Sequence, residues 1–272
     1  MNRTQRRQLP KKLAKGYVAY EGPSRNDGKP IVVIVTMHTT NIKTGPMPTA
    51  WIIRSDIHPQ EAVKTGEDFS ICGNCHLRPE MVEKLKALGV DNPPSCYVTV
   101  FQAPAQIYKA YHRGIYVKVS LDELAEILRG RTLRIGGYGD GAVVPTAVWE
   151  RLLQFVTRHT AYTHGWTMPN FDASFLKIAM VSVDPYSVAE YAAEFAALPT
   201  TGRKFRMLED GETPKVDEVL CPNFTHKTQC IDCGLCAGVS VQAKHVVAHD
   251  HGPRSAYRNA QVAAKKAARL AA

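Results

Sequence analysis

The run SLDELAEILRGRTLRIGGYGDGAVVPTAVWERLLQFVTRH (residues 120–159) contains the pattern that decides the fold, because a helix, a strand and a second helix follow one another in it. Ser120, with Glu123 three residues later, predicts a capped helix start. The segment 131–140 is typical of a strand that ends in a glycine-rich turn, and 145–159 is typical of a helix with proline in its first turn. A strand between two helices predicts a β-α unit of a parallel sheet.

The same alternation extends along the chain and predicts parallel strands with right-handed crossovers. We expect further strands at 29–40, 50–56, 96–102, 160–166, 176–184, 202–208 and 245–250, and further helices at 104–114 and 187–198. About six to eight strands suit a barrel better than a long open sheet. The expected fold class is therefore α/β, a compact or partial (β/α) TIM-like barrel with a C-terminal cysteine-rich metal-binding segment.

Positive charge is concentrated at the two ends of the 272-residue chain, whose net charge is +9. We expect a basic N-terminal tail at 1–21, one barrel-like catalytic domain at 22–252 that includes a metal segment at 221–251, and a basic C-terminal helix at 253–272. Basic clusters of this kind suit a polyanion such as a nucleic acid. The alternative is a pair of solvated tails.

The sequence shows no apolar run near the roughly 20 residues of a membrane span, and its N-terminus lacks the apolar segment of a signal peptide. We therefore expect a protein of the cytoplasm with no membrane partner. Seven cysteines in a reducing compartment favour metal ligation over disulfides. An odd number also cannot be fully paired within one chain.

Four cysteines lie close together in CPNFTHKTQCIDCGLCAG (221–238), and three of them have C-x2-C-x2-C spacing. Each x2 step lets two sulfur atoms of one tight loop face the same ion, and thiolates bind zinc and iron–sulfur clusters strongly. The run therefore predicts a metal site, with structural disulfides as the alternative. The candidate ligands are Cys221, Cys230, Cys233, Cys236, His245, His249 and His251.

A second possible metal or cluster site precedes this one, with C-x2-C-x20-C spacing. It consists of Cys72 and Cys75 in ICGNCHLRP (71–79), followed by Cys96. Three thiolates can hold three irons of a [4Fe–4S] cluster and leave one iron open, or they can bind zinc with His76 as the fourth ligand. The alternative is three buried thiols without a metal.

Polar residues follow the predicted strands, where the active residues of barrel enzymes gather. Asp140 follows a GGYG turn whose glycines would let a substrate approach the backbone, and Asp184 stands just before a predicted helix. Both are candidate catalytic carboxylates, and for both the alternative role is that of a helix N-cap. The candidate substrate-binding residues are His38, Gly136, Gly137, Tyr138, Tyr162, His164 and Trp166.

The stretches ICGNCHLRP (71–79), SCYVTVFQAP (95–104), LRIGGYGDGAVVP (133–145) and TAYTH (160–164), with the cysteine-rich tail, resemble a family of phage-encoded proteins. The resemblance covers about residues 22–251. Through it the chain is similar to queuine tRNA-ribosyltransferases and to their phage relatives. These relatives are DNA transglycosylases that exchange guanine for a 7-deazaguanine base and so hide phage DNA from host restriction nucleases.

This resemblance implies a TIM-barrel glycosyltransferase that acts in the host cytoplasm on DNA, or on tRNA, with a 7-deazaguanine-type base as its second substrate. Asp184 would be the nucleophile at the sugar C1′, and Asp140 the second aspartate. The cysteines of the C-x2-C-x2-C run, with one later histidine, would bind a structural zinc ion. The target base must leave the duplex stack, and the candidate aromatic residues would receive it.

A second resemblance is to radical S-adenosylmethionine enzymes, which are also partial β/α barrels. It implies that Cys72, Cys75 and Cys96 hold a [4Fe–4S] cluster that binds S-adenosylmethionine, and that the four C-terminal cysteines hold an auxiliary cluster. All seven cysteines are then used. A third hypothesis is a zinc-stapled nucleic-acid-binding protein without enzymatic activity.

Overall fold

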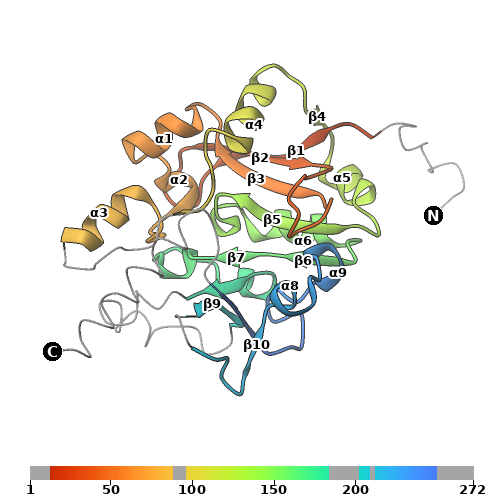
Figure 1. Ribbon diagram of the computed structural model, residues 1–272. Coiled ribbons are helices and arrows are strands. Elements are labelled where there is room, and N and C mark those ends of the chain that lie inside the picture. Colours follow the sequence, from red (N-terminus) through yellow and green to blue (C-terminus); the bar gives the residue numbers. More distant parts are fainter. Residues whose placement is uncertain (1–12, 88–95, 184–201, 209–211, 250–272) are drawn as a thin grey trace, which may run out of the picture.

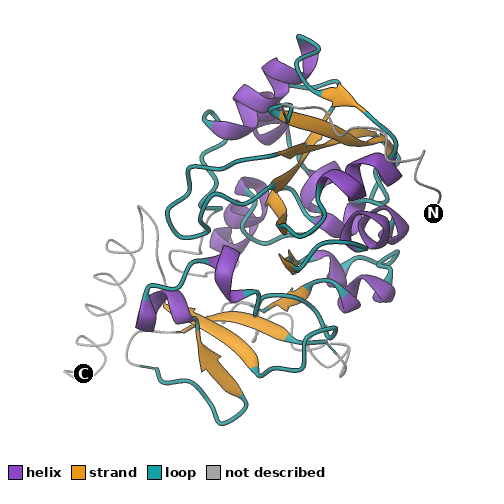
Figure 2. Cartoon of the chain, turned by 90° about the vertical axis from the view of Figure 1, so that its right-hand side faces the viewer, coloured by secondary structure: helices purple, strands orange, loops and turns teal. Residues whose placement is uncertain are grey.

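The computed structural model describes residues 13–87, 96–183, 202–208 and 212–249. Within them, the strands form a six-stranded sheet in the order β4-β1-β2-β3-β5-β6 and a five-stranded sheet in the order β10-β11-β9-β8-β7 (Figure 1). Figure 2 shows the first sheet in the upper part of the view and the second sheet in the lower part.

The strands are β1 (Gly16–Pro23), β2 (Pro30–Thr36), β3 (Thr49–Arg54), β4 (Val117–Lys118), β5 (Thr132–Tyr138), β6 (Arg158–Thr160), β7 (Tyr162–Thr163), β8 (Met180–Ser182), β9 (Lys204–Leu208), β10 (Glu218–Leu220) and β11 (His245–His249). The helices are α1 (Pro59–Thr65), α2 (Phe69–Cys72), α3 (Pro79–Ala87), α4 (Ala103–His112), α5 (Leu121–Ile127), α6 (Thr146–Leu153), α8 (Pro222–His226) and α9 (Cys230–Cys233). Short 3-10 helices are η2 (Gly141–Val143), η3 (Gly165–Thr167) and η4 (Ala173–Lys177).

One extended segment joins the two sheets. Strand β6 pairs with β5 of the first sheet, β7 pairs with β8 of the second, and only Ala161 separates β6 from β7. All pairs from β3 through β5 and β6, and from β7 through β8, β9, β11 and β10, are parallel. The α/β fold with parallel-rich sheets that the sequence predicts is therefore confirmed.

The first three strands differ from the prediction, because β1, β2 and β3 pair antiparallel. The turn between β1 and β2 spans only residues 24–29, where the Ser24 N–H donates to the Lys29 carbonyl (2.8 Å). A parallel connection needs about a dozen residues or more, so this short turn requires an antiparallel hairpin. The expectation of parallel units throughout was wrong here.

The core is built around β2, whose residues Val32 to Val35 are fully buried. Helices α5 and α6 pack against each other and add Leu128 and Trp149 to the same buried cluster. Each large apolar side chain removed from water contributes roughly 1.5–3 kcal/mol to the free energy of folding. The predicted cap of α5 is confirmed, because the Ser120 hydroxyl accepts from the Glu123 N–H (3.2 Å).

Several predicted elements are shorter than expected or absent. Residues 96–102 form a loop and a turn instead of a strand, and both Tyr97 and Phe101 are more than half exposed. Residues 160–166 include β7 but continue into η3, and 176–184 contains only the short strand β8. The helix expected at 187–198 lies outside the described residues.

The basic tail expected at 1–21 overlaps the folded part of the chain, because β1 begins at Gly16 and Tyr17 is buried. The basic C-terminal helix expected at 253–272 lies outside the described residues. Among the residues that the structure describes, no helix has the length and apolar character that crossing a bilayer requires.

Candidate metal centres

Cys72, Cys75 and Cys96, the first cysteine group, come together although Cys96 is distant in the sequence. Cys72 ends α2, and the Cys75 N–H donates to the Cys72 carbonyl (3.2 Å). The Cys96 N–H donates to the carbonyl of Leu77 (2.9 Å), which holds Cys96 beside this loop. Burial and then the charges of Cys75, Asp68 and Cys96 raise the pKa of Cys72 well above its ordinary value. The three thiols therefore lie within electrostatic reach of one another.

A buried arginine fixes the backbone around this group. The Arg78 guanidinium donates to the carbonyls of Gly73 (3.0 Å) and Gly66 (2.8 Å) and to the Asp68 carboxylate (2.7 Å), and both charged side chains are about 5% exposed or less. Gly73 has a φ of 56°, and a Cβ there would lie 3.1 Å from the Met168 sulfur. The tight turn between the first two cysteines therefore requires glycine.

Tyr138, His76 and His164 surround the first cysteine group. The rings of His76 and His164 are in edge-to-face contact, with centroids 5.1 Å apart. The Tyr138 side chain is 4% exposed, and its hydroxyl has no hydrogen-bond partner among the described residues. Burial raises the pKa of Tyr138, and charges that include those of Cys72 and Cys96 raise it further, so this hydroxyl lies near the thiols.

This group lies where parallel strands end. Tyr138 is the last residue of β5, and His164 directly follows β7. In β/α barrels, the catalytic residues gather at the carboxyl ends of the strands. The location, three thiols and a buried hydroxyl without a protein partner fit a bound inorganic group better than a plain core.

The Asp140 carboxylate is 8% exposed and is fully engaged by protein donors. Its Oδ1 accepts from the Ala142 N–H (2.9 Å), and its Oδ2 accepts from the Thr163 hydroxyl (3.0 Å) and from the N–H groups of His164 (2.7 Å) and Gly165 (3.0 Å). Asp140 is also the N-cap of η2. The structure thus places it in the capping role that the sequence left open as the alternative.

Cys221, Cys230, Cys233 and Cys236, the second cysteine group, also come together. Burial raises the pKa of Cys236 to about 12, the Tyr162 hydroxyl lowers it by a hydrogen bond, and the charges of the other three cysteines raise it. Burial likewise raises the pKa of Cys230, and the charges of Cys221 and Cys233 raise it further. The four thiols that the sequence groups by spacing therefore lie within electrostatic reach of one another.

Arg203 holds the backbone of the second cysteine group, as Arg78 holds that of the first. Its side chain donates to the carbonyls of Leu235 (2.7 Å), Ala237 (2.7 Å), Ala243 (3.0 Å) and Lys244 (2.6 Å). Burial lowers the pKa of Arg203, and the charge of the nearby Cys236 thiolate raises it in part.

Two further cations face the second cysteine group. The charge of Arg134 lowers the pKa of Cys230 against the larger effect of burial. Burial lowers the pKa of Lys43, and the charges of Cys221 and Cys230 raise it. The loop that carries Lys43 also accepts the Cys230 N–H at the Lys43 carbonyl (3.2 Å). The positive charges lie where a tetrathiolate metal centre, which is anionic, needs them.

Two of the histidines proposed as zinc ligands, His245 and His249, lie on β11, next to other protein groups. The His245 Nδ1 accepts from the Lys204 N–H (3.0 Å), and its Nε2 faces the Asp217 carboxylate at 3.8 Å. The His249 ring packs edge-on against Phe224. His251 lies outside the described residues. Whether one of these histidines joins the cysteines as a ligand stays a prediction.

The described cysteine side chains do not have the geometry of a formed metal site. Among the described residues, no three Cys, His, Asp or Glu side chains already have the arrangement of a metal-ion site. Thiols must lose their protons to bind a metal, and binding commonly draws the ligands together. Proximity of the cysteines is therefore the observation that supports metal binding, and the coordination itself remains a prediction.

The remaining predicted site residues lie in several places. A Cβ at Gly137 would lie 2.5 Å from the Thr49 side chain, so Gly137 allows β5 to pack closely on β3. Gly136, also within β5, has a φ of 78°, a left-handed conformation that favours glycine. Tyr162 packs on Phe205, with ring centroids 4.7 Å apart. The Trp166 indole donates to the Ser182 carbonyl (3.0 Å) near the ends of β7 and β8.

His38 lies away from both cysteine groups, in a cavity described below. Asp184 lies outside the described residues. Sequence reasoning pointed to Arg203 only as a polar residue at a strand end and to Arg134 only as a substrate or cofactor contact, and it missed Arg78 and Lys43. Only Arg78 carried a signal, since it stands three residues after Cys75.

No family model, no curated protein and no solved structure matches this chain.

Proposed function

We propose that this protein is an iron–sulfur enzyme of the radical S-adenosylmethionine type, with one cluster on each cysteine group. The observation that carries the proposal is the convergence of Cys72, Cys75 and Cys96 at the carboxyl ends of β5 and β7. Three thiolates leave one iron of a [4Fe–4S] cluster without a protein ligand. Such a cluster would supply the electron for reductive cleavage of S-adenosylmethionine.

The parallel strands support this proposal as an open or partial β/α barrel. Strands β3, β5, β6 and β7, β8 and β9 follow one another in space as they do in the chain. Such an order brings the loops after consecutive strands to one rim, where a substrate can meet residues from several strands. His164, which follows β7, contacts His76 of the first cysteine loop, and Trp166 lies near the ends of β7 and β8.

The second cysteine group suits an auxiliary cluster with four protein ligands. Its four thiols lie within electrostatic reach of one another, and Arg134 and Lys43 provide two positive charges beside them. A cluster with four thiolates carries net negative charge, and cations and hydrogen bonds near the sulfur atoms stabilise it and tune its reduction potential.

Exchange of guanine in DNA for a 7-deazaguanine base, the function that the first resemblance implies, is our second proposal, and the net charge of +9 favours it because positive charge suits a DNA or tRNA substrate. In that reaction a zinc ion on the second cysteine group would be structural. Because the oxygens of Asp140 are taken up by protein donors, the nucleophile would have to be Asp184.

Metal content of the protein purified without oxygen distinguishes these proposals. We expect a brown protein with about eight irons per chain. The variant C72A/C75A/C96A should retain about four of them, and C230A/C233A should also retain about four, which assigns one cluster to each group. Reduced wild-type protein should convert S-adenosylmethionine to 5′-deoxyadenosine, whereas C72A/C75A/C96A should not.

A colourless protein with about one zinc per chain would reject the iron–sulfur proposal. Guanine release from DNA by that zinc form would then establish base exchange. DNA binding without any guanine release would instead establish the zinc-stapled binding protein.

A further inference from the structure

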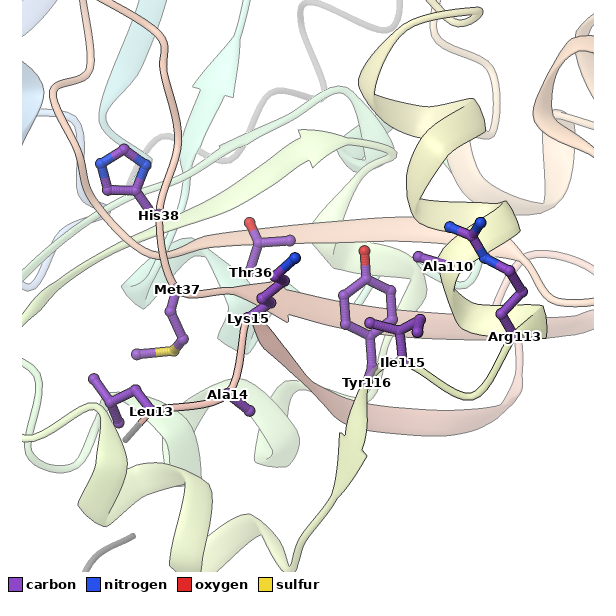
Figure 3. A pocket seen from close by; sticks show the side chains of 10 residues that line it. All are labelled: Leu13, Ala14, Lys15, Thr36, Met37, His38, Ala110, Arg113, Ile115 and Tyr116. Atoms are coloured by element: carbon purple, nitrogen blue, oxygen red, sulfur yellow. The ribbon is translucent and has the colours of Figure 1, made fainter. Parts of the chain in front are cut away.

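A cavity of about 580 Å³ opens on the first sheet, in a part of the molecule that neither cysteine group uses. Its walls come from the residues before β1, the end of β2, the end of α4 and the segment that leads to β4 (Figure 3). Ligand sites in proteins have volumes of about 300–1,000 Å³, so this cavity can hold a small organic molecule.

The titratable side chains of this cavity are basic or phenolic. Lys15, His38, Arg113 and Tyr116 line it, and no carboxylate does. Within the described part of the chain, the side chains of Lys15, His38 and Arg113 have no ion pair or hydrogen bond. The charges of Lys15 and Arg113, beside one cavity without a neutralising acid, create a local positive potential.

The polar groups lie on one side of the cavity. Figure 3 shows the Lys15 ammonium, the Arg113 guanidinium and the Tyr116 hydroxyl directed to the same side of the view. The Arg113 charge partly offsets the rise in the pKa of Tyr116 that burial causes, so these two groups are neighbours. Arginine and lysine together bind phosphate oxygens well, because one offers a planar fork and the other a point charge.

The other side of the cavity is apolar. Leu13, Met37 and Ile115 line it, and Leu13 and Ile115 are 39% and 47% exposed. The Tyr116 ring lies directly against β1, since a Cβ at Gly16 would lie 2.9 Å from it. A flat aromatic wall beside exposed aliphatic side chains offers a surface on which a planar, apolar group can rest.

We propose that this cavity binds an organic phosphate monoester, with its phosphate at Lys15 and Arg113 and its planar body against Tyr116 and Ile115. A mononucleotide has both parts and fits the volume. The site is independent of the clusters, so it can exist whether or not the iron–sulfur proposal holds.

Titration calorimetry of the full chain with adenosine 5′-monophosphate, adenosine and inorganic phosphate tests this site. We expect the nucleotide to bind and its affinity to fall with added salt. Adenosine, which lacks the phosphate, should bind at least about tenfold more weakly than the nucleotide, because it loses the charge-assisted hydrogen bonds to Lys15 and Arg113. Inorganic phosphate alone should also bind about tenfold more weakly, because it lacks the apolar contacts.

The variant K15Q/R113Q should weaken nucleotide binding by about a hundredfold, which is roughly tenfold for each lost charge. The control K64Q/K109Q removes the same two charges from exposed positions outside the cavity, one of them on the same helix as Arg113, and should bind like wild type. Equal weakening by both double variants would reduce the effect to general attraction by a basic surface. No binding of the nucleotide at millimolar concentration, or equal binding of adenosine, would overturn the proposal.

Discussion

The Asp140 carboxylate accepts the backbone N–H of His164 at 2.7 Å. This hydrogen bond ties the turn after β5 to the turn after β7, and it places the His164 ring beside His76 and near Cys96. Asp140 therefore positions the histidine next to the first cysteine group from a distance of 24 residues in the sequence.

The substitution Asp140→Asn should destabilise the protein. In the wild type, both carboxylate oxygens of Asp140 accept from protein donors. Asparagine replaces one of these oxygens with an NH₂ group, so at least one buried donor loses its acceptor. We expect a loss of about 2–4 kcal/mol in the free energy of unfolding, measured by urea denaturation. The variant Asp172→Asn is the control, because Asp172 is also an N-cap but is 30% exposed. If D140N keeps wild-type stability and loses only activity, Asp140 is a catalytic group and not a positioning residue.

The substitution Tyr138→Phe should leave the metal-free protein as stable as wild type or slightly more stable, because it removes a buried hydroxyl that has no partner among the described residues. In the iron-loaded protein, the same change should lower the reduction potential of the first cluster, since the Tyr138 hydroxyl would donate a hydrogen bond to a cluster or cysteine sulfur and phenylalanine could not. Thermal denaturation and a redox titration followed by electron paramagnetic resonance measure the two effects.

Tyr17→Phe is the matched control, because the Tyr17 hydroxyl is also buried but accepts from the Ala14 N–H (3.1 Å). It should destabilise the protein without changing the potential of either cluster. An unchanged potential in Y138F would show that the hydroxyl does not contact the bound group.

The substitutions Arg78→Lys and Arg203→Lys should each weaken a different metal centre. Each arginine binds several backbone or carboxylate oxygens around one cysteine group, and a lysine cannot reproduce such a fork. R78K should lose the metal of the first group and R203K that of the second, each lowering metal content by about half. Mass spectrometry of the intact protein measures the content. Loss of both metals in either variant would mean that the arginine supports the whole fold.

Glu218 makes stability depend on pH in a defined window. Glu218 is on β10 and Arg206 is on β9, with β11 between them, and their side chains pair at 2.7 Å. The hydrogen bond from Arg206 lowers the pKa of Glu218 below 4.5. A lowered folded-state pKa means that the pair stabilises the protein above about pH 4.5 and that this contribution disappears as the pH falls further. The variant Glu218→Gln should therefore have a lower melting temperature than wild type at pH 7, and this difference in melting temperature should shrink below pH 4.5.

Glu126→Gln serves as the control for this experiment. Glu126 pairs with Arg129 on the protein surface, where an ion pair contributes little. Its melting temperature should follow wild type at every pH. A constant difference between E218Q and wild type from pH 7 to pH 3 would show that the Glu218 charge is not the cause.

Elements whose signals lie within a few residues were predicted well. The capping pair Ser120 and Glu123 marks the start of α5, and the β-branched run at 29–40 contains β2. Strand β1 was missed, because its residues follow a basic stretch and show only a short apolar pattern. The segment 96–102 was misread, because Tyr97 and Phe101 are exposed, Val98 and Val100 are only partly buried against the core, and none of its residues is in a strand.

By itself, the sequence determined the helix caps, the tight C-x2-C turns and the three-plus-four grouping of the cysteines, because each depends on residues that are neighbours in the chain or on spacing alone. Only the tertiary structure decided that Asp140 is enclosed by donors after β7 and that the His245 ring accepts the Lys204 N–H. These facts depend on contacts between distant segments, whose free energy comes from shared burial and mutual hydrogen bonds that no local pattern encodes.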